Sequence, residues 1–194
     1  MLALWQHWEP YAMRAWRVVP VRPGAILQFG RSPFRGKSTV LADGTRVLTG
    51  DTILHLHLDN PALERLQVSE GRGLWHLARV LASDLDHLAR RVRSGELGEV
   101  QALRGVTVLA AAAGRLGFEV RPLAPGLATA AVRQVAALVL VAYDQHGLER
   151  LDRGLPWPGE IWMSRDALLS RLEPQPSHPA ARRGDRTRPP VLDQ

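Results

Sequence analysis

The chain has 194 residues, of which 45% are hydrophobic, and this suits one globular domain with a sizeable core. The absence of cysteine excludes disulfides, thiolate metal sites and thiol nucleophiles. The net charge of +6 comes from arginines spread along the chain, with no helix-turn-helix, RNP-like or zinc-finger pattern, which argues against nucleic acid as a partner.

The N-terminal segment is predicted to form an amphipathic helix that ends before Pro20, because apolar residues recur there at helical spacing. Its aromatic face carries Trp5, Trp8 and Trp16, which either dock on the core or touch a membrane surface. No signal peptide or transmembrane segment is expected, since the first eight residues lack a basic region before an apolar run. We therefore expect a cytoplasmic or membrane-peripheral location.

A small antiparallel sheet is expected next. Asp43-Gly44 is a dipeptide favoured in tight hairpin turns, and strict alternation of apolar and polar residues precedes Asn60. The expected strands cover residues 25–30, 37–42, 45–48 and 52–59, with a second turn at 50–51.

The second half is predicted to be mainly helical, because it carries a long leucine stripe and two alanine-rich apolar runs. Prolines and arginines from Glu173 onward predict a disordered tail over 173–194. We therefore expect a single α+β domain over 1–172, with a small antiparallel sheet packed with several helices and a helical majority. The expected elements are helices over 74–92, 106–116 and 127–143, strands over 118–121 and 160–163, and a last helix to residue 172 capped by Ser164.

Five sequence blocks occur in an order that resembles the YkoP-like domain of Firmicutes and related Gram-positive bacteria. The resemblance spans roughly residues 4–172. The blocks are Trp8-Glu9-Pro10, Ala42-Asp43-Gly44-Thr45 with Gly50-Asp51, Leu54 to Asn60, Gly105-Val106-Thr107 with Arg115 to Val120, and Ile161 to Arg165.

The resemblance implies a context rather than a reaction, because this family has no assigned activity. Its domains also occur fused to polysaccharide deacetylases. This implies a link to cell-envelope or spore polysaccharide metabolism, with a deacetylase as one expected partner.

The strongest candidates for chemistry are His55, His57 and Asp59. Residues two apart on a strand face the same side, with Cα atoms roughly 6.5–7 Å apart, so the two histidines are candidate general bases or metal ligands. His55 and Asp59 are roughly 13 Å apart on a straight strand, too far to share one ion. We therefore predict no metal and no cofactor. A purely structural, hydrogen-bonded role for the histidines is the alternative.

Asp43, Arg115 and Trp162 are candidate ligand-binding residues. Asp43 is also explained by turn chemistry, Arg115 by an ion pair with Glu119, and Trp162 either by core packing or by stacking on a sugar ring. The chain lacks a G-x-S-x-G elbow, a phosphate loop and a deacetylase metal motif. These absences favour a non-catalytic accessory or binding domain for an anionic or carbohydrate ligand. The alternatives are an envelope-glycan hydrolase or transferase using the His55/His57 face, and a peripheral membrane protein held by the tryptophan helix.

Overall fold

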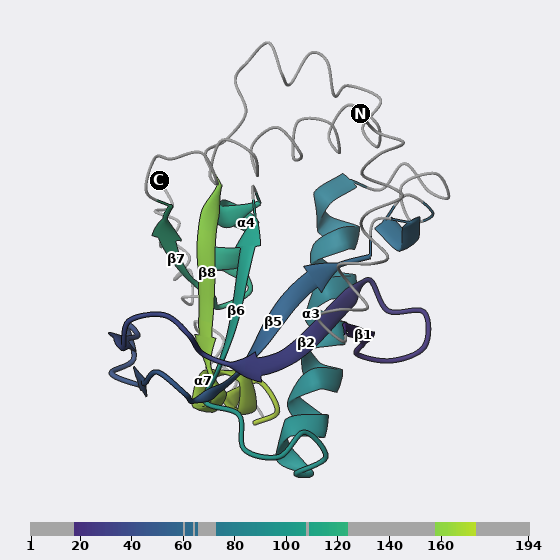
Figure 1. Cartoon of the computed structure of the whole chain (residues 1–194). Helices are drawn as coiled ribbons and strands as arrows, with labels where there is room; N and C mark the ends of the chain where they lie inside the picture. The colour runs from purple at the N-terminus through teal and green to yellow at the C-terminus, as the bar shows by residue number, and fades with distance from the viewer. Residues whose placement is uncertain are drawn as a thin grey trace, which may run out of the picture.

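The computed structural model describes residues 18–59, 61–63, 65, 73–107, 109–123 and 158–173, and a six-stranded mixed sheet lies at its centre (Figure 1). The strand order is β1-β2-β5-β6-β8-β7, and β5 and β6 run parallel while the other neighbours run antiparallel. The strands are β1 (Val19–Pro20), β2 (Leu27–Pro33), β5 (Thr52–Leu58), β6 (Ala102–Thr107), β7 (Glu119–Pro122) and β8 (Gly159–Ser164).

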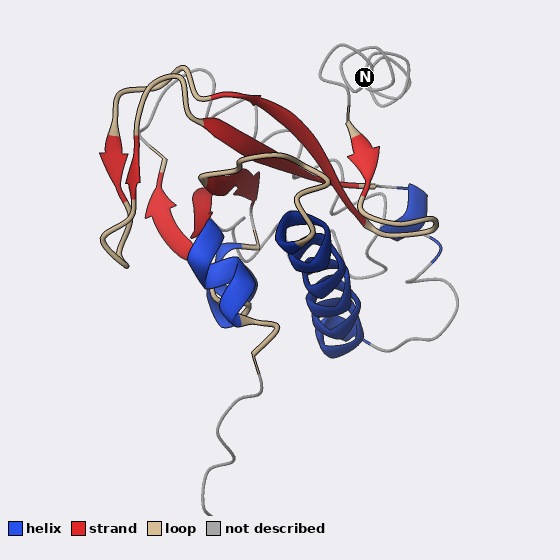
Figure 2. Cartoon of the chain, turned by 90° about the horizontal axis from the view of Figure 1, so that it is seen from below, coloured by secondary structure: helices blue, strands red, loops and turns tan. Residues whose placement is uncertain are grey.

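Three helices, α3 (Gly73–Arg93), α4 (Ala110–Arg115) and α7 (Arg165–Ser170), cover one face of this sheet. Figure 2 shows α3 and α7 on that same side. The leucine stripe of α3 packs against the apolar side chains of β2 and β5, and complete burial of one such leucine contributes about 1.5–3 kcal/mol. The main core therefore lies between the sheet and these helices.

A two-stranded hairpin, β3 (Thr39–Val40) and β4 (Arg46–Val47), packs on part of the opposite face. Gly44 lies at its turn with φ 85°, a conformation that glycine adopts without steric cost. Phe34 and Val47 pack there with Ile53 and Trp162 in a second, smaller core. The hairpin therefore covers only part of the face that lies opposite the helices.

A buried carboxylate fixes α3 to the edge of the sheet. Asp84 is fully buried, and its Oδ2 accepts hydrogen bonds from the backbone N–H groups of Ile26 (3.0 Å) and Leu27 (3.1 Å). Its Oδ1 lies 2.8 Å from Nη2 of Arg22. These contacts join α3 to the start of β2, which determines how the helix lies against the sheet.

The expected helical majority is wrong, because strand exceeds helix in the described part of the chain. The expected small antiparallel sheet is also wrong, since β5 pairs in parallel with a strand over Ala102–Thr107 and the hairpin forms a separate sheet. The expected helix over 106–116 begins only at Ala110. Its alanines have high helix propensity, but pairing on both edges places the preceding residues in β6.

Other local predictions are confirmed. The hairpin turn, the strand over β5, the long helix α3 and the strand β8 lie where the sequence patterns place them. Ser164 caps α7 by accepting a hydrogen bond from the N–H of Ala167 (2.9 Å). Val19 and Pro20 lie in a strand, whereas a helix was expected up to Pro20. The tryptophan helix, the expected helix over 127–143 and nearly all of the tail lie outside the described residues.

Candidate functional site

Strand β5 divides its side chains between the two faces of the sheet, as its alternation predicts. Leu54 and Leu56 belong to the main core, and Leu58 packs against it. His55 and His57 are half-buried on the opposite face. Register decides this division, because a slip by one residue would move both imidazoles into the apolar core.

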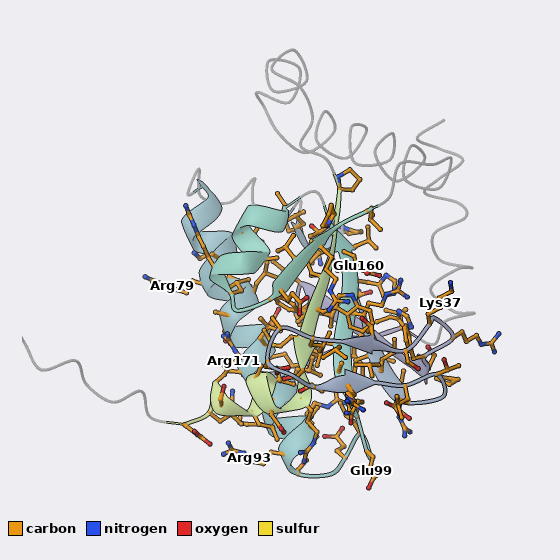
Figure 3. All side chains as sticks on the ribbon, turned by 90° about the vertical axis from the view of Figure 1, so that its left-hand side faces the viewer. Lys37, Arg79, Arg93, Glu99, Glu160 and Arg171 are labelled. Atoms are coloured by element: carbon orange, nitrogen blue, oxygen red, sulfur yellow. The ribbon has the colours of Figure 1, made fainter. Side chains whose placement is uncertain are left out.

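Neighbouring strands add further polar side chains beside the two histidines. Across the sheet, His55 pairs with Arg104 of β6, and His57 pairs with Gln28 of β2. Glu160 of β8 completes the group through Arg104, and Figure 3 shows it on the side of the sheet away from Arg171. We call Gln28, His55, His57, Arg104 and Glu160 the polar face.

Arg104 is held firmly within the polar face. Its Nε donates a 2.6 Å hydrogen bond to Oε1 of Glu160, and its Nη2 also pairs with that oxygen. The guanidinium carbon lies 5.4 Å from the ring centre of Trp162 and 6.0 Å from that of Phe34. A guanidinium fixed by an ion pair and two aromatic rings loses little side-chain entropy when it binds a ligand.

The environment favours the neutral form of both histidines. Burial, and then the nearby charge of Arg104, lower the pKa of His55 below its usual 6.5. Burial, and then His55, lower the pKa of His57 in the same direction. At neutral pH each imidazole therefore carries one donor and one acceptor nitrogen, and the ring of His55 can bind a hydroxyl group or accept a proton.

Trp162 is part of the support under the polar face, because only 2% of it is exposed. Its ring lies between Arg104 and Arg121, whose guanidinium carbon is 5.9 Å from the ring centre, and Phe34 contacts it edge-on. Arg121 also donates to Thr39 and to the carbonyl of Val40 in the hairpin. Trp162 therefore does not present an open face on which a sugar ring can stack.

Asp59 touches the polar face through Gln28, whereas Asp43 lies in the hairpin turn, and both carboxylates have structural contacts. Asp59 accepts from the side-chain amide of Gln28 (2.8 Å) and from the N–H of Ala62 (2.8 Å), so it caps the helical turn that follows. Asp43 accepts from the N–H of Thr45 in the hairpin turn. The pKa of Asp43 is lowered, mainly by a hydrogen bond from the hydroxyl of Ser164.

Arg115 lies exposed in the last turn of α4, on the helical side of the sheet. The expected partner of Arg115, Glu119, instead accepts hydrogen bonds from Arg121 and from the backbone of Ala42. Arg115 is therefore far in the fold from the histidines, and the two sets of candidates do not form one site.

The polar face offers groups for recognition and for proton transfer. Within the described ranges, no group of three or more histidine, aspartate or glutamate side chains is arranged to hold a metal ion.

None of the helices in these ranges has the length and apolarity that a bilayer crossing requires.

Arg104 and Glu160 are site residues that the sequence prediction missed. Gly105 interrupts the alternation of polar and apolar residues between Ala102 and Thr107, so this alternation does not indicate a strand clearly. The helix expected over 106–116 also overlaps the end of this segment. Glu160 lies 56 positions from Arg104, so no local pattern joins them. The sequence did contain one signal for Arg104, because a charged residue inside a short and mostly apolar run is typical of a strand with one polar face.

The mixed sheet, with helices on one face and a hairpin beside the polar face on the other, defines an α+β domain. The model of the YkoP domain matches residues 1–172, so the chain belongs to the YkoP family. No curated protein and no solved structure matches the chain. The site is therefore interpreted from its own geometry.

Proposed function

We propose that this YkoP domain is a non-catalytic binding module whose polar face recognises a hydroxyl-rich saccharide. The observation that carries the proposal is the polar face itself, where neutral imidazoles, an amide and a fixed guanidinium–carboxylate pair lie side by side on three neighbouring strands and β8. Such planar side chains combine donors and acceptors, which suits hydroxyl groups.

Charge balance favours a saccharide over a simple anion. The charge of Arg104 is opposed by Glu160, that of Arg121 is opposed by Glu119, and the lowered pKa of His55 keeps its imidazole neutral. A free anion would have to compete with Glu160 for the guanidinium. Val106, which is 45% exposed and pairs with Glu160, offers an apolar surface for the C–H side of a sugar ring.

The resemblance makes bacterial envelope polysaccharides the first ligands to test, with a polysaccharide deacetylase as the proposed protein partner. An isothermal titration compares N-acetylglucosamine tetrasaccharide, its de-N-acetylated form and a carboxylate-bearing hyaluronan tetrasaccharide. We expect either the N-acetylglucosamine tetrasaccharide or its de-N-acetylated form to bind more tightly than the hyaluronan tetrasaccharide. Preference for hyaluronan would contradict the charge argument.

The variants that test the face are His55→Ala and Arg104→Gln, and the matched control is His87→Ala. His87 is a half-buried histidine on α3, which lies on the opposite side of the sheet, and its ring contacts the carbonyl of Ser83. We expect each face variant to weaken binding by about tenfold, equivalent to about 1.4 kcal/mol, and the control to bind normally. The proposal would be overturned if His55→Ala and Arg104→Gln bound the saccharide as tightly as the control His87→Ala does.

A second candidate function is glycan hydrolysis or transfer, favoured by the lowered pKa of His55, which leaves an imidazole able to act as a general base. Incubation of the tetrasaccharides with wild-type protein tests this function through release of shorter sugars. Turnover that disappears in His55→Ala but persists in His87→Ala would replace the binding module with an enzyme.

A further inference from the structure

A cavity of about 430 Å³ lies on the helical side of the sheet, away from the polar face. It is formed where α7, α3, the end of β8 and the turn between α4 and β7 meet, and its rim includes Asp86, Ser170 and Arg171. Figure 3 shows Arg171, the residue that follows the last residue of α7, on the side of α3. Small-molecule sites typically have volumes of about 300–1,000 Å³, so the cavity has room for a small ligand.

The rim of the cavity is polar but electrically balanced. Nε and Nη2 of Arg171 both lie on Oδ1 of Asp86, at 3.1 and 3.0 Å, while Nη1 donates to the carbonyl of Leu116 at 3.0 Å. Most donors of the guanidinium are thereby used within the protein. Among the described residues, Oδ2 of Asp86 accepts no hydrogen bond, so the rim presents an acceptor that is already charge-compensated.

Apolar side chains form one part of the lining, which we call the floor. Leu116, Met163 and Ala167 form it, and Met163 is 3% exposed. Gly117 leaves room at the turn, where a Cβ atom would lie 3.6 Å from Cε of Met163. The φ of Gly117 is +91°, so a larger residue there would also be strained. A lining that combines an apolar floor with a polar rim suits an amphiphilic molecule.

We propose that this cavity is a second ligand site, for a neutral small molecule with an apolar body and a hydroxyl head. The body contacts Met163 and Ala167, and the hydroxyl donates to Oδ2 of Asp86 and lies beside Ser170. A carboxylate head is disfavoured because it cannot donate to Asp86 and because the guanidinium of Arg171 is already engaged by Asp86 and Leu116. An ammonium head can donate, but the paired Arg171 has already neutralised the carboxylate that would attract it.

A matched series of six-carbon probes tests the head group: 1-hexanol, hexanoate and hexylammonium, titrated separately into ¹⁵N-labelled protein. For 1-hexanol we expect amide shifts to concentrate at Gly117, Ala167 and Ser170, with a Kd on the order of millimolar. Hexanoate should bind at least about tenfold more weakly, and hexylammonium should be intermediate. Tighter binding of hexanoate than of 1-hexanol, or shifts located elsewhere, would overturn the proposal.

Two variants close the cavity, and one matched variant leaves it open. Ala167→Leu fills the floor, and Ser170→Leu covers the rim from an exposed position, so the second variant remains informative if the first fails to fold. Ser94→Leu makes the same kind of change at an exposed residue that does not line the cavity. We expect the closing variants to weaken 1-hexanol binding by about tenfold and Ser94→Leu to bind as wild type. Unchanged affinity in a folded closing variant would refute the site.

Discussion

Replacing Asp84 by alanine is expected to destabilise the domain by about 3–4 kcal/mol. The carboxylate is fully buried and accepts two backbone hydrogen bonds, from Ile26 and Leu27, and hydrogen bonds to a charged group contribute about 1.5–3 kcal/mol each. Removing one partner of a buried pair costs about 3–5 kcal/mol. The side chain of Arg22 is 35% exposed, so its charge regains water in the variant and the loss lies toward the lower end.

Asp86→Ala is the control for this substitution, because it removes a second aspartate two positions along the same helix. Asp86 is 40% exposed and pairs with Arg171, which keeps its bond to the carbonyl of Leu116. An exposed ion pair of this kind contributes about 0–1 kcal/mol. Asp84→Asn keeps the shape of the side chain but loses its charge, so we expect its loss of stability to lie between those of Asp84→Ala and Asp86→Ala.

Urea unfolding followed by circular dichroism measures these differences, through the midpoint and the slope of the transition. We expect an unchanged slope and a lower midpoint for Asp84→Ala, and a midpoint close to wild type for Asp86→Ala. If both alanine variants lost less than about 1 kcal/mol, the buried carboxylate would not anchor α3 to β2, and the reasoning would be refuted.

The polar face should also make stability depend on pH, because burial lowers the pKa of His55 from 6.5. The contribution of neutral His55 to the free energy of unfolding is fully present above pH 6.5, the unfolded pKa. It is lost as the pH falls through the lowered pKa of the folded state. His55→Gln should flatten this dependence in urea titrations between pH 7.5 and pH 5, whereas an unchanged profile would be contrary evidence. Gly105→Ala should destabilise by about 1–3 kcal/mol, because the new Cβ would lie 3.2 Å from Cγ1 of Ile161; a wild-type Tm would show that the core yields there. Ser164→Ala should cost about 1 kcal/mol in chemical unfolding by removing the cap of α7, and Ser164→Asn, which keeps an acceptor for Ala167 and a donor for Asp43, should recover part of it.

Several elements could be predicted from the sequence because their causes are local. The alternation in β5 assigned Leu54 and His55 to opposite faces, and Asp43-Gly44 located the hairpin turn. The leucine stripe located α3, and Gly95, with φ 78°, lies just beyond its end. Each of these features depends on residues within a few positions of one another, so a local pattern is sufficient.

The strand over Ala102–Thr107 could not be predicted in the same way. The alanines that follow it have high helix propensity, and no local feature opposed a helix that began at Val106. Pairing with β5 on one edge and β8 on the other decides the conformation of this segment. Because strand propensity depends on such neighbours, a short strand beside a helix-forming run is easily misassigned.

The sequence by itself therefore determined the family, the turns, the long helix and the side of β5 on which the histidines lie. Only the tertiary structure decided which side chains share a site. Arg104 and Glu160 are far from His55 along the chain and reach it through strand pairing. Asp59 touches the site only through Gln28, and Trp162 is buried against Arg104. The physical reason is that periodicity records only the face to which a residue belongs, whereas the composition of a site depends on which strands become neighbours.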